Sequence, residues 1–191
     1  MLQTVFPLTK VAHCKLLFNR DQYVSCHINV SDLPERLAAI AVDGKFYSFF
    51  KVLPKAQKAL EVVAKLTHKG DEIAVTVSKR GYVLWVYEPD GKLASSKRSP
   101  LHLKLRGSAP CTIIYERDRF QPCYLKVADM SQTLAGIKYQ ANLYSLFRRE
   151  NEAQGTLEIA AKLTTRNDEV VLIPAQVGYS IFVLESAASL A

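Results

Sequence analysis

Four aromatic residues lie between two lysines in residues 45–51, whose sequence is KFYSFFK. Side chains of a β-strand alternate between its two faces, so every second residue of this segment would share one face. These residues are Lys45, Tyr47, Phe49 and Lys51. Surfaces of this kind bind single-stranded nucleic acid, because bases stack on aromatic rings while Lys side chains contact phosphates. We therefore predict that these four residues bind nucleic acid. The open alternative is that the rings pack inside the protein.

Positive charge is concentrated in residues 92–106, KLASSKRSPLHLKLR. The chain has a net charge of +7, and this segment carries five basic residues and no acidic one. The five are Lys92, Lys97, Arg98, Lys104 and Arg106. We expect this basic connection to take part in nucleic acid binding, since it would attract phosphates. The alternative hypothesis is a structural, assembly or regulatory protein that docks an acidic protein partner on the same charge.

The four cysteines recur at equal spacing in two parts of the chain. They are Cys14, Cys26, Cys111 and Cys123. If residues 11–18 and 22–30 form a hairpin, Cys14 faces Cys26 among apolar neighbours, and we expect small buried core residues. A disulfide or redox pair is the alternative. The neighbouring histidines would lie on the opposite face of the hairpin, which argues against a zinc site.

Motifs that mark common catalytic or cofactor sites do not occur in this sequence. It has no glycine-rich phosphate loop, no HExxH, no CxxC and no GxSxG. We expect a non-catalytic protein that needs no cofactor and no metal. An enzyme whose polar groups converge in a pocket between two parts of the chain is a third hypothesis.

A repeat organises the whole chain. Residues 14–88 match residues 111–185 without a gap at a constant offset of 97, and 26 of the 75 pairs are identical. We predict a tandem duplication, with a first repeat at 1–91, the basic connection at 92–106, and a second repeat at 107–191. The two repeats are expected to pack into one compact unit. Function should be found mainly where the repeats differ.

Within each repeat the pattern predicts hairpin, hairpin, helix, hairpin. Apolar residues recur at helical spacing in 55–68 and 152–165, which predicts one-sided helices packed on a sheet. Asp43-Gly44 suits a tight two-residue turn, and a looser or different turn is expected at Gln140-Ala141. The predicted fold class is α+β, with about six antiparallel strands and one helix in each half and an approximate two-fold relation between the halves.

Four strands followed by a helix, given twice, resembles the order of elements in the Whirly and Pur-alpha families of single-stranded nucleic acid-binding proteins. Those families also build one domain from two such repeats, and the resemblance covers this order alone. It implies binding of single-stranded DNA or RNA. The sequence has no apolar run long enough for a membrane span and no secretory signal, so we expect a cytoplasmic protein with no membrane partner.

Overall fold

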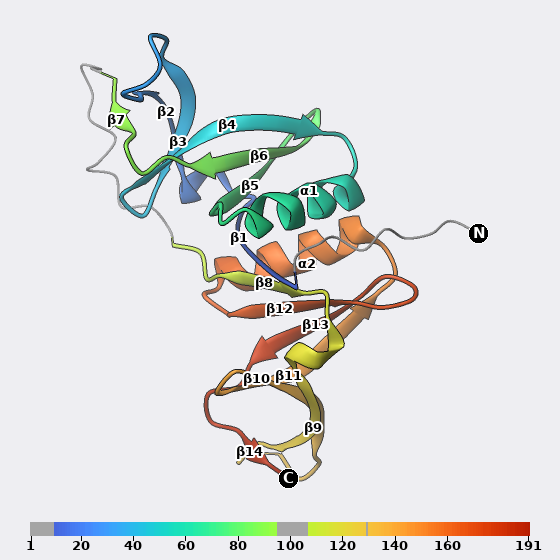
Figure 1. Cartoon of the computed structure of the whole chain (residues 1–191). Coiled ribbons are helices and arrows are strands. Elements are labelled where there is room, and N and C mark those ends of the chain that lie inside the picture. Colours follow the sequence, from blue (N-terminus) through green and yellow to red (C-terminus); the bar gives the residue numbers. More distant parts are fainter. Residues whose placement is uncertain (1–9, 95–106, 129) are drawn as a thin grey trace.

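The computed structural model describes residues 10–94, 107–128 and 130–191, and it shows an α+β fold with one large mixed sheet and two α-helices (Figure 1). The first part of the chain (residues 10–94) forms β1 (Val11–Leu17), a short 3-10 helix η1 (Arg20–Gln22), β2 (Val24–Asn29), β3 (Leu37–Val42), β4 (Lys45–Leu53), α1 (Ala56–His68), β5 (Ile73–Ser78), β6 (Gly81–Tyr87) and β7 (Lys92–Leu93). The second part (residues 107–191) forms β8 (Cys111–Ile114), η3 (Arg117–Arg119), β9 (Gln121–Lys126), β10 (Leu134–Tyr139), β11 (Asn142–Glu150), α2 (Ala153–Thr165), β12 (Val170–Pro174), β13 (Tyr179–Leu184) and β14 (Ser189–Leu190).

All described strands belong to one 14-stranded sheet, in the order β14-β9-β10-β11-β13-β12-β8-β1-β5-β6-β4-β3-β2-β7. The two parts meet at its centre, where β1 and β8 pair antiparallel and Cys14 lies opposite Cys111. On their other edges, β1 pairs with β5 and β8 pairs with β12, both in parallel. The expectation of purely antiparallel strands is therefore wrong for these two pairs.

The predicted hairpin of residues 11–18 with 22–30 is also wrong. β2 pairs with β3 and β7, so that Cys26 lies opposite Ala39 and far from Cys14 in the sheet order. The physical reason is burial, because Ala12, Leu16 and Leu17 are fully buried on the two faces of β1. A strand that is apolar on both faces belongs in the middle of a covered sheet, with a partner strand on each side.

Both α-helices form where the apolar periodicity predicts them, to within one residue at the start. They contact each other and β1, and Figure 1 shows the sheet curving around them, with β4 and β6 on one side and β12 and β13 on the other. Their buried faces and the central strands form the main hydrophobic core. Two residues after each helix the backbone has a positive φ, +93° at Gly70 and +72° at Asn167, a conformation that Gly and Asn adopt readily. Neither helix is long and apolar enough to cross a membrane.

The sheet face turned away from the helices carries two smaller clusters. One lies around Tyr47 in the first part and the other around Tyr144 in the second. The turns beside them differ in class, because Asp43 and Gly44 both have positive φ, whereas at Gln140-Ala141 only Gln140 does. Both turns are two residues long, so the looser turn expected at Gln140-Ala141 does not occur.

Candidate functional site

Tyr47 does not lie on an open stacking surface. Its side chain is fully buried, and its hydroxyl donates to Glu72 Oε1 at 2.5 Å. Lys45 Nζ binds the other carboxylate oxygen of Glu72 at 2.7 Å and lies 4.9 Å from the centre of the Tyr87 ring. The first two predicted binding residues thus form an internal network with Glu72.

The charge state of this network is set by the same contacts. Burial, followed by the hydrogen bond to the Glu72 carboxylate, raises the pKa of Tyr47 and keeps the phenol protonated. Burial alone would also raise the pKa of Glu72, but hydrogen bonds from Lys45 and Tyr47 outweigh it and lower that pKa. In the second part, Tyr144 donates to Glu169 Oε1 at 2.7 Å in the same way. Glu169 therefore has the same structural role in the second part as Glu72 has in the first.

Lys51 lies on the opposite face of β4 from Phe49, because β4 contains a bulge. Phe49 pairs with Trp85, and Lys51, two residues later, pairs with the adjacent residue of β6, Leu84. Leu84 belongs to the core that faces the helices. An extra residue in one strand reverses the alternation beyond it. The prediction that Lys51 shares the face of Tyr47 and Phe49 is therefore wrong. Phe49 is 48% exposed, with its ring edge-on to Trp85 at 5.8 Å between centroids.

The basic connection is described only at its start. Lys92 is exposed in β7, which pairs with β2. The other four predicted residues lie outside the described residues: Lys97, Arg98, Lys104 and Arg106.

The cysteines are all free thiols. Cys14 and Cys111 are buried in the main core, as expected for small apolar core residues, although the strand partner of Cys14 is different from the one predicted. Cys26 and Cys123 are partly exposed. In the described part of the chain, no three His, Cys, Asp or Glu side chains group in a way that could hold a metal ion.

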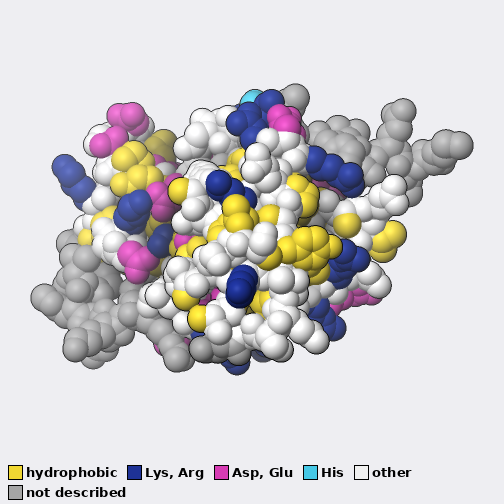
Figure 2. All heavy atoms as spheres, turned by 90° about the horizontal axis from the view of Figure 1, so that it is seen from below, with side chains coloured by type: hydrophobic (Ala, Val, Ile, Leu, Met, Phe, Trp, Pro, Cys, Tyr) yellow, Lys and Arg dark blue, Asp and Glu magenta, His cyan; other side chains and the backbone are white. Residues whose placement is uncertain are grey.

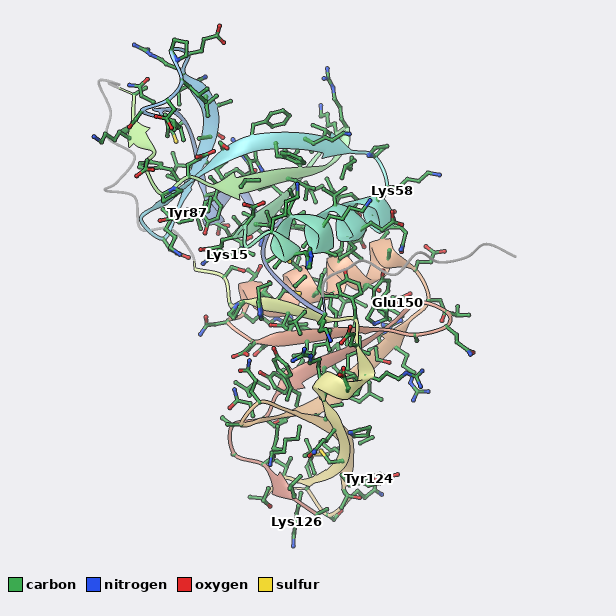
Figure 3. All side chains as sticks on the ribbon, in the orientation of Figure 1. Lys15, Lys58, Tyr87, Tyr124, Lys126 and Glu150 are labelled. Carbon is green, nitrogen blue, oxygen red and sulfur yellow. The ribbon has the colours of Figure 1, made fainter. Side chains whose placement is uncertain are left out.

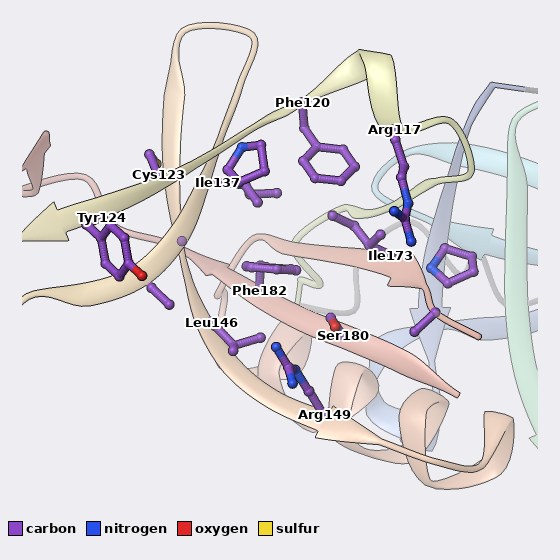
Figure 4. A pocket seen from close by; sticks show the side chains of 15 residues that line it. Arg117, Phe120, Cys123, Tyr124, Ile137, Leu146, Arg149, Ile173, Ser180 and Phe182 are labelled. Carbon is purple, nitrogen blue, oxygen red and sulfur yellow. The ribbon is translucent and has the colours of Figure 1, made fainter. Parts of the chain in front are cut away.

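A cavity of about 490 Å³ opens on the sheet face of the second part that is turned away from the helices (Figure 4). Its walls come from η3 and from β9 to β13, and they are mainly apolar, with the rings of Phe120 and Phe182 prominent. Arg117, Arg149 and Ser180 are polar residues of the lining, and no acidic residue belongs to it. The cavity therefore presents rings and positive charge together.

Arg149 reaches this cavity because β11 has a bulge at the same place as β4. Across the bulge, Leu146 pairs with Phe182, Arg148 with Ile181 and Arg149 with Ser180. Regular alternation would place Arg148 on the face of Leu146, but the extra residue brings Arg149 there instead. Figure 4 shows the Arg117 side chain near Ile173 and the Arg149 side chain near Leu146, with Ser180 between them in this view.

The two arginines of the cavity differ from the neighbouring arginines in their contacts. Among the described residues, neither guanidinium makes a hydrogen bond or an ion pair, whereas neighbouring Arg148 lies 3.6 Å from Glu150 and Arg119 lies 3.9 Å from Glu116. Two unpaired guanidinium groups beside apolar walls favour a ligand that carries both negative charge and a flat apolar group.

The surface around the cavity also carries apolar and basic side chains. Tyr124 lines the cavity and is 67% exposed, and Figure 3 shows it and Lys126 pointing outward from β9. Figure 2, which views this end of the molecule, shows hydrophobic and basic side chains interspersed over the middle of the face, with acidic side chains mostly toward its edges. The site thus continues from the cavity onto an exposed surface.

A second cavity, of about 450 Å³, lies near the end of α1 and includes His13, Cys14 and Glu72. Two of its polar side chains already have partners, since His13 Nδ1 lies 3.1 Å from Thr112 Oγ1 and Glu72 binds Tyr47 and Lys45. Burial lowers the pKa of His13 more than the Glu169 charge raises it. This cavity is accordingly the weaker candidate.

Sequence reasoning missed the cavity, but a signal for it was present. At the offset of 97, Arg149 stands where the first part has Val52, and Phe182 stands where it has Trp85. These are differences between the two segments, and the site was expected among such differences.

Together, the fold and the cavity define a strand-rich α+β protein with a basic, aromatic-lined site. The chain matches no protein family model, and comparisons with characterised proteins and with solved structures also gave no match. The resemblance to the Whirly and Pur-alpha order of elements therefore stays a prediction.

Proposed function

We propose that this protein is a non-catalytic binding protein for single-stranded nucleic acid, and that the cavity of the second part is its binding site. The observation that carries the proposal is the pair of guanidinium groups of Arg117 and Arg149, which have no partner among the described residues. They lie in one open cavity with the rings of Phe120, Tyr124 and Phe182. Bases of any sequence can stack on rings, while guanidinium groups meet the phosphates between them. Duplex DNA keeps its bases stacked inside and would leave the rings unused.

The net charge of +7 supports a polyanionic partner. Five of the positive charges lie in residues 92–106, and the described beginning of that segment, Lys92, is exposed in β7 at one edge of the sheet. We propose that the basic connection adds affinity that does not depend on sequence, while the cavity holds bases.

We also propose that the two parts descend from one duplicated unit. Support comes from the constant offset of 97 and from the equal order of elements in the two parts. The bulges between Phe49 and Lys51 and between Leu146 and Arg148 fall at matching positions. After such a duplication, the first part kept large rings at Phe49 and Trp85, while the second part acquired the cavity.

The direct test is fluorescence anisotropy with labelled single-stranded DNA, single-stranded RNA and duplex DNA, at low and near-physiological salt. We expect saturable binding that favours single strands and weakens as salt rises. Absence of binding to all three at low salt would refute the proposal, and a search for an acidic protein partner would follow.

The site is tested by replacing both cavity arginines, Arg117→Gln with Arg149→Gln. Each lost phosphate contact should reduce the slope of log affinity against log salt by roughly 0.7 for a single strand. Arg148→Gln is the matched control, because it removes a positive charge next in sequence but on the other face of β11. Equal effects of Arg148→Gln and Arg149→Gln would contradict the assignment of the cavity, since they would show a response to net charge alone.

A further inference from the structure

The first part of the chain shows what fills the space that the second part leaves open. At the offset of 97, Phe182 corresponds to Trp85 and Leu146 to Phe49. In the first part these positions hold two large rings, which pack edge to face at 5.8 Å between centroids and an angle of 79°. In the second part both side chains are smaller, and they line the cavity of about 490 Å³.

The surroundings of the filled space are equally informative. The Trp85 indole N–H donates to Thr76 Oγ1 at 2.9 Å, so a flat heteroaromatic group there has its polar edge satisfied. Beside it, the Arg20 guanidinium lies 4.8 Å from the centre of the Tyr23 ring and donates to the Tyr23 hydroxyl at 2.8 Å. A planar aromatic group at the position of Trp85 thus meets the ring of Phe49 and a hydrogen-bond acceptor on Thr76. The guanidinium of Arg20 over the Tyr23 ring belongs to the same surroundings.

The second part keeps the guanidinium but changes its partner. Arg117 corresponds to Arg20, whereas Phe120 replaces Tyr23 and removes the hydroxyl that the guanidinium would bind. Charge and polarity are also added, because Arg149 and Ser180 stand where the first part has apolar valines. The space vacated by the two large rings is therefore edged by two cations and a hydroxyl, with no acidic residue in the lining.

We propose that this cavity binds one nucleotide unit, with the base in the space that Trp85 and Phe49 fill in the first part, and with the phosphate between Arg117 and Arg149. The base packs against Phe120 and Phe182, and Ser180 is placed to hydrogen-bond its edge. In the described residues of the first part, Phe49 and Trp85 occupy the matching positions, so we expect each chain to take one such unit. This inference rests on the proposed function and specifies its ligand.

The test fills the cavity with the first part's own residues, in the double variant Leu146→Phe with Phe182→Trp. These side chains pack together at the matching positions of the first part, so the fold should tolerate them. Leu146→Phe alone, at the partly exposed rim, is a milder second variant. The control is Trp85→Phe, the reverse exchange in the first part. Circular dichroism and thermal melting establish that each variant is folded.

Two ligands are titrated into each variant: nucleoside 5′-monophosphates by calorimetry and a labelled single-stranded oligonucleotide by anisotropy. The filled variant should lose affinity for both by roughly 5- to 150-fold, the range that one lost base stack corresponds to, while Trp85→Phe stays within about 2-fold. Binding of the oligonucleotide with undiminished affinity by the filled, folded variants would overturn the cavity as the binding site, while the binding of single-stranded nucleic acid by the protein would stand.

A second result would uphold the nucleotide cavity and overturn the nucleic acid function. Cavity-dependent binding of the monophosphates, together with no binding of any strand, would uphold the nucleotide cavity with a free nucleotide as its ligand and would overturn the nucleic acid function. Binding of neither ligand to the unaltered protein would overturn both.

Discussion

Gly178→Ala should destabilise the protein far more than an equivalent change at another glycine with the same backbone angle. Gly178 has a φ of +72°, and a Cβ atom there would lie 2.0 Å from the Glu150 carbonyl oxygen and 2.5 Å from Asn151 Cα. These are backbone atoms and cannot rotate away. The glycine closes the turn between β12 and β13, where the Ala175 N–H donates to the Gly178 carbonyl at 3.0 Å. Both strands line the cavity.

Gly44 offers a matched control, because its φ is +75° and an added Cβ would meet no atom within 4 Å. Gly44→Ala therefore isolates the cost of the left-handed conformation, about 1–2 kcal/mol for a residue with a Cβ. Gly178→Ala adds the displacement of the backbone at the end of β11, which costs about 1–3 kcal/mol more by analogy with overpacked cores. The expected totals are about 1–2 kcal/mol for Gly44→Ala and about 2–5 kcal/mol for Gly178→Ala.

The assay is thermal and urea unfolding followed by circular dichroism and by the fluorescence of Trp85, the only tryptophan. For a chain of this length, each kcal/mol should lower the Tm by roughly 2–4 °C. Oligonucleotide binding by Gly178→Ala should also weaken, since the β12–β13 hairpin supplies Ile173 and Ser180 to the cavity. Equal losses of stability in the two variants would refute the reasoning, because the close approach of Gly178 to Glu150 would then have no energetic consequence.

Two further predictions concern the tyrosine network and the basic connection. Tyr47→Phe should cost about 1.5 kcal/mol or more at pH 7, because it removes a hydrogen bond to the charged Glu72. Since the pKa of Glu72 is lowered in the folded state, this stabilisation is present above the ordinary carboxylate pKa and is lost as the pH falls through the folded-state pKa. Urea unfolding should therefore show that the stabilities of Tyr47→Phe and the unaltered protein converge in acid. A stability difference that does not depend on pH would contradict the role of the carboxylate. Neutralising the connection should weaken oligonucleotide binding and flatten its salt dependence, and unchanged affinity in anisotropy titrations would remove that segment from the site. The residues to change together are Lys97, Arg98, Lys104 and Arg106.

Local features of the fold could be predicted from the sequence because they depend on neighbours along the chain. The apolar periodicity placed both α-helices, and the residue types of Asp43 and Gly44 predicted a tight two-residue turn that the structure confirms. The partner of β1 could not be predicted in this way. Its neighbours β5 and β8 come from distant parts of the chain, whereas a hairpin with β2 is the connection that local spacing favours.

The candidate site, like the fold, could be predicted from the sequence only in part. The sequence by itself determined that aromatic and basic residues gather in 45–51, that positive charge gathers in 92–106, and that residues 14–88 match 111–185 at 26 of 75 positions. Only the tertiary structure decided which of these residues meet. One extra residue in each bulged strand reverses the alternation of side chains, so Lys51 leaves the predicted surface and Arg149 enters the cavity. Register depends on contacts across the whole sheet, and these contacts decided that Tyr47 is buried beside Glu72, while Phe120, Tyr124 and Phe182 line an open site.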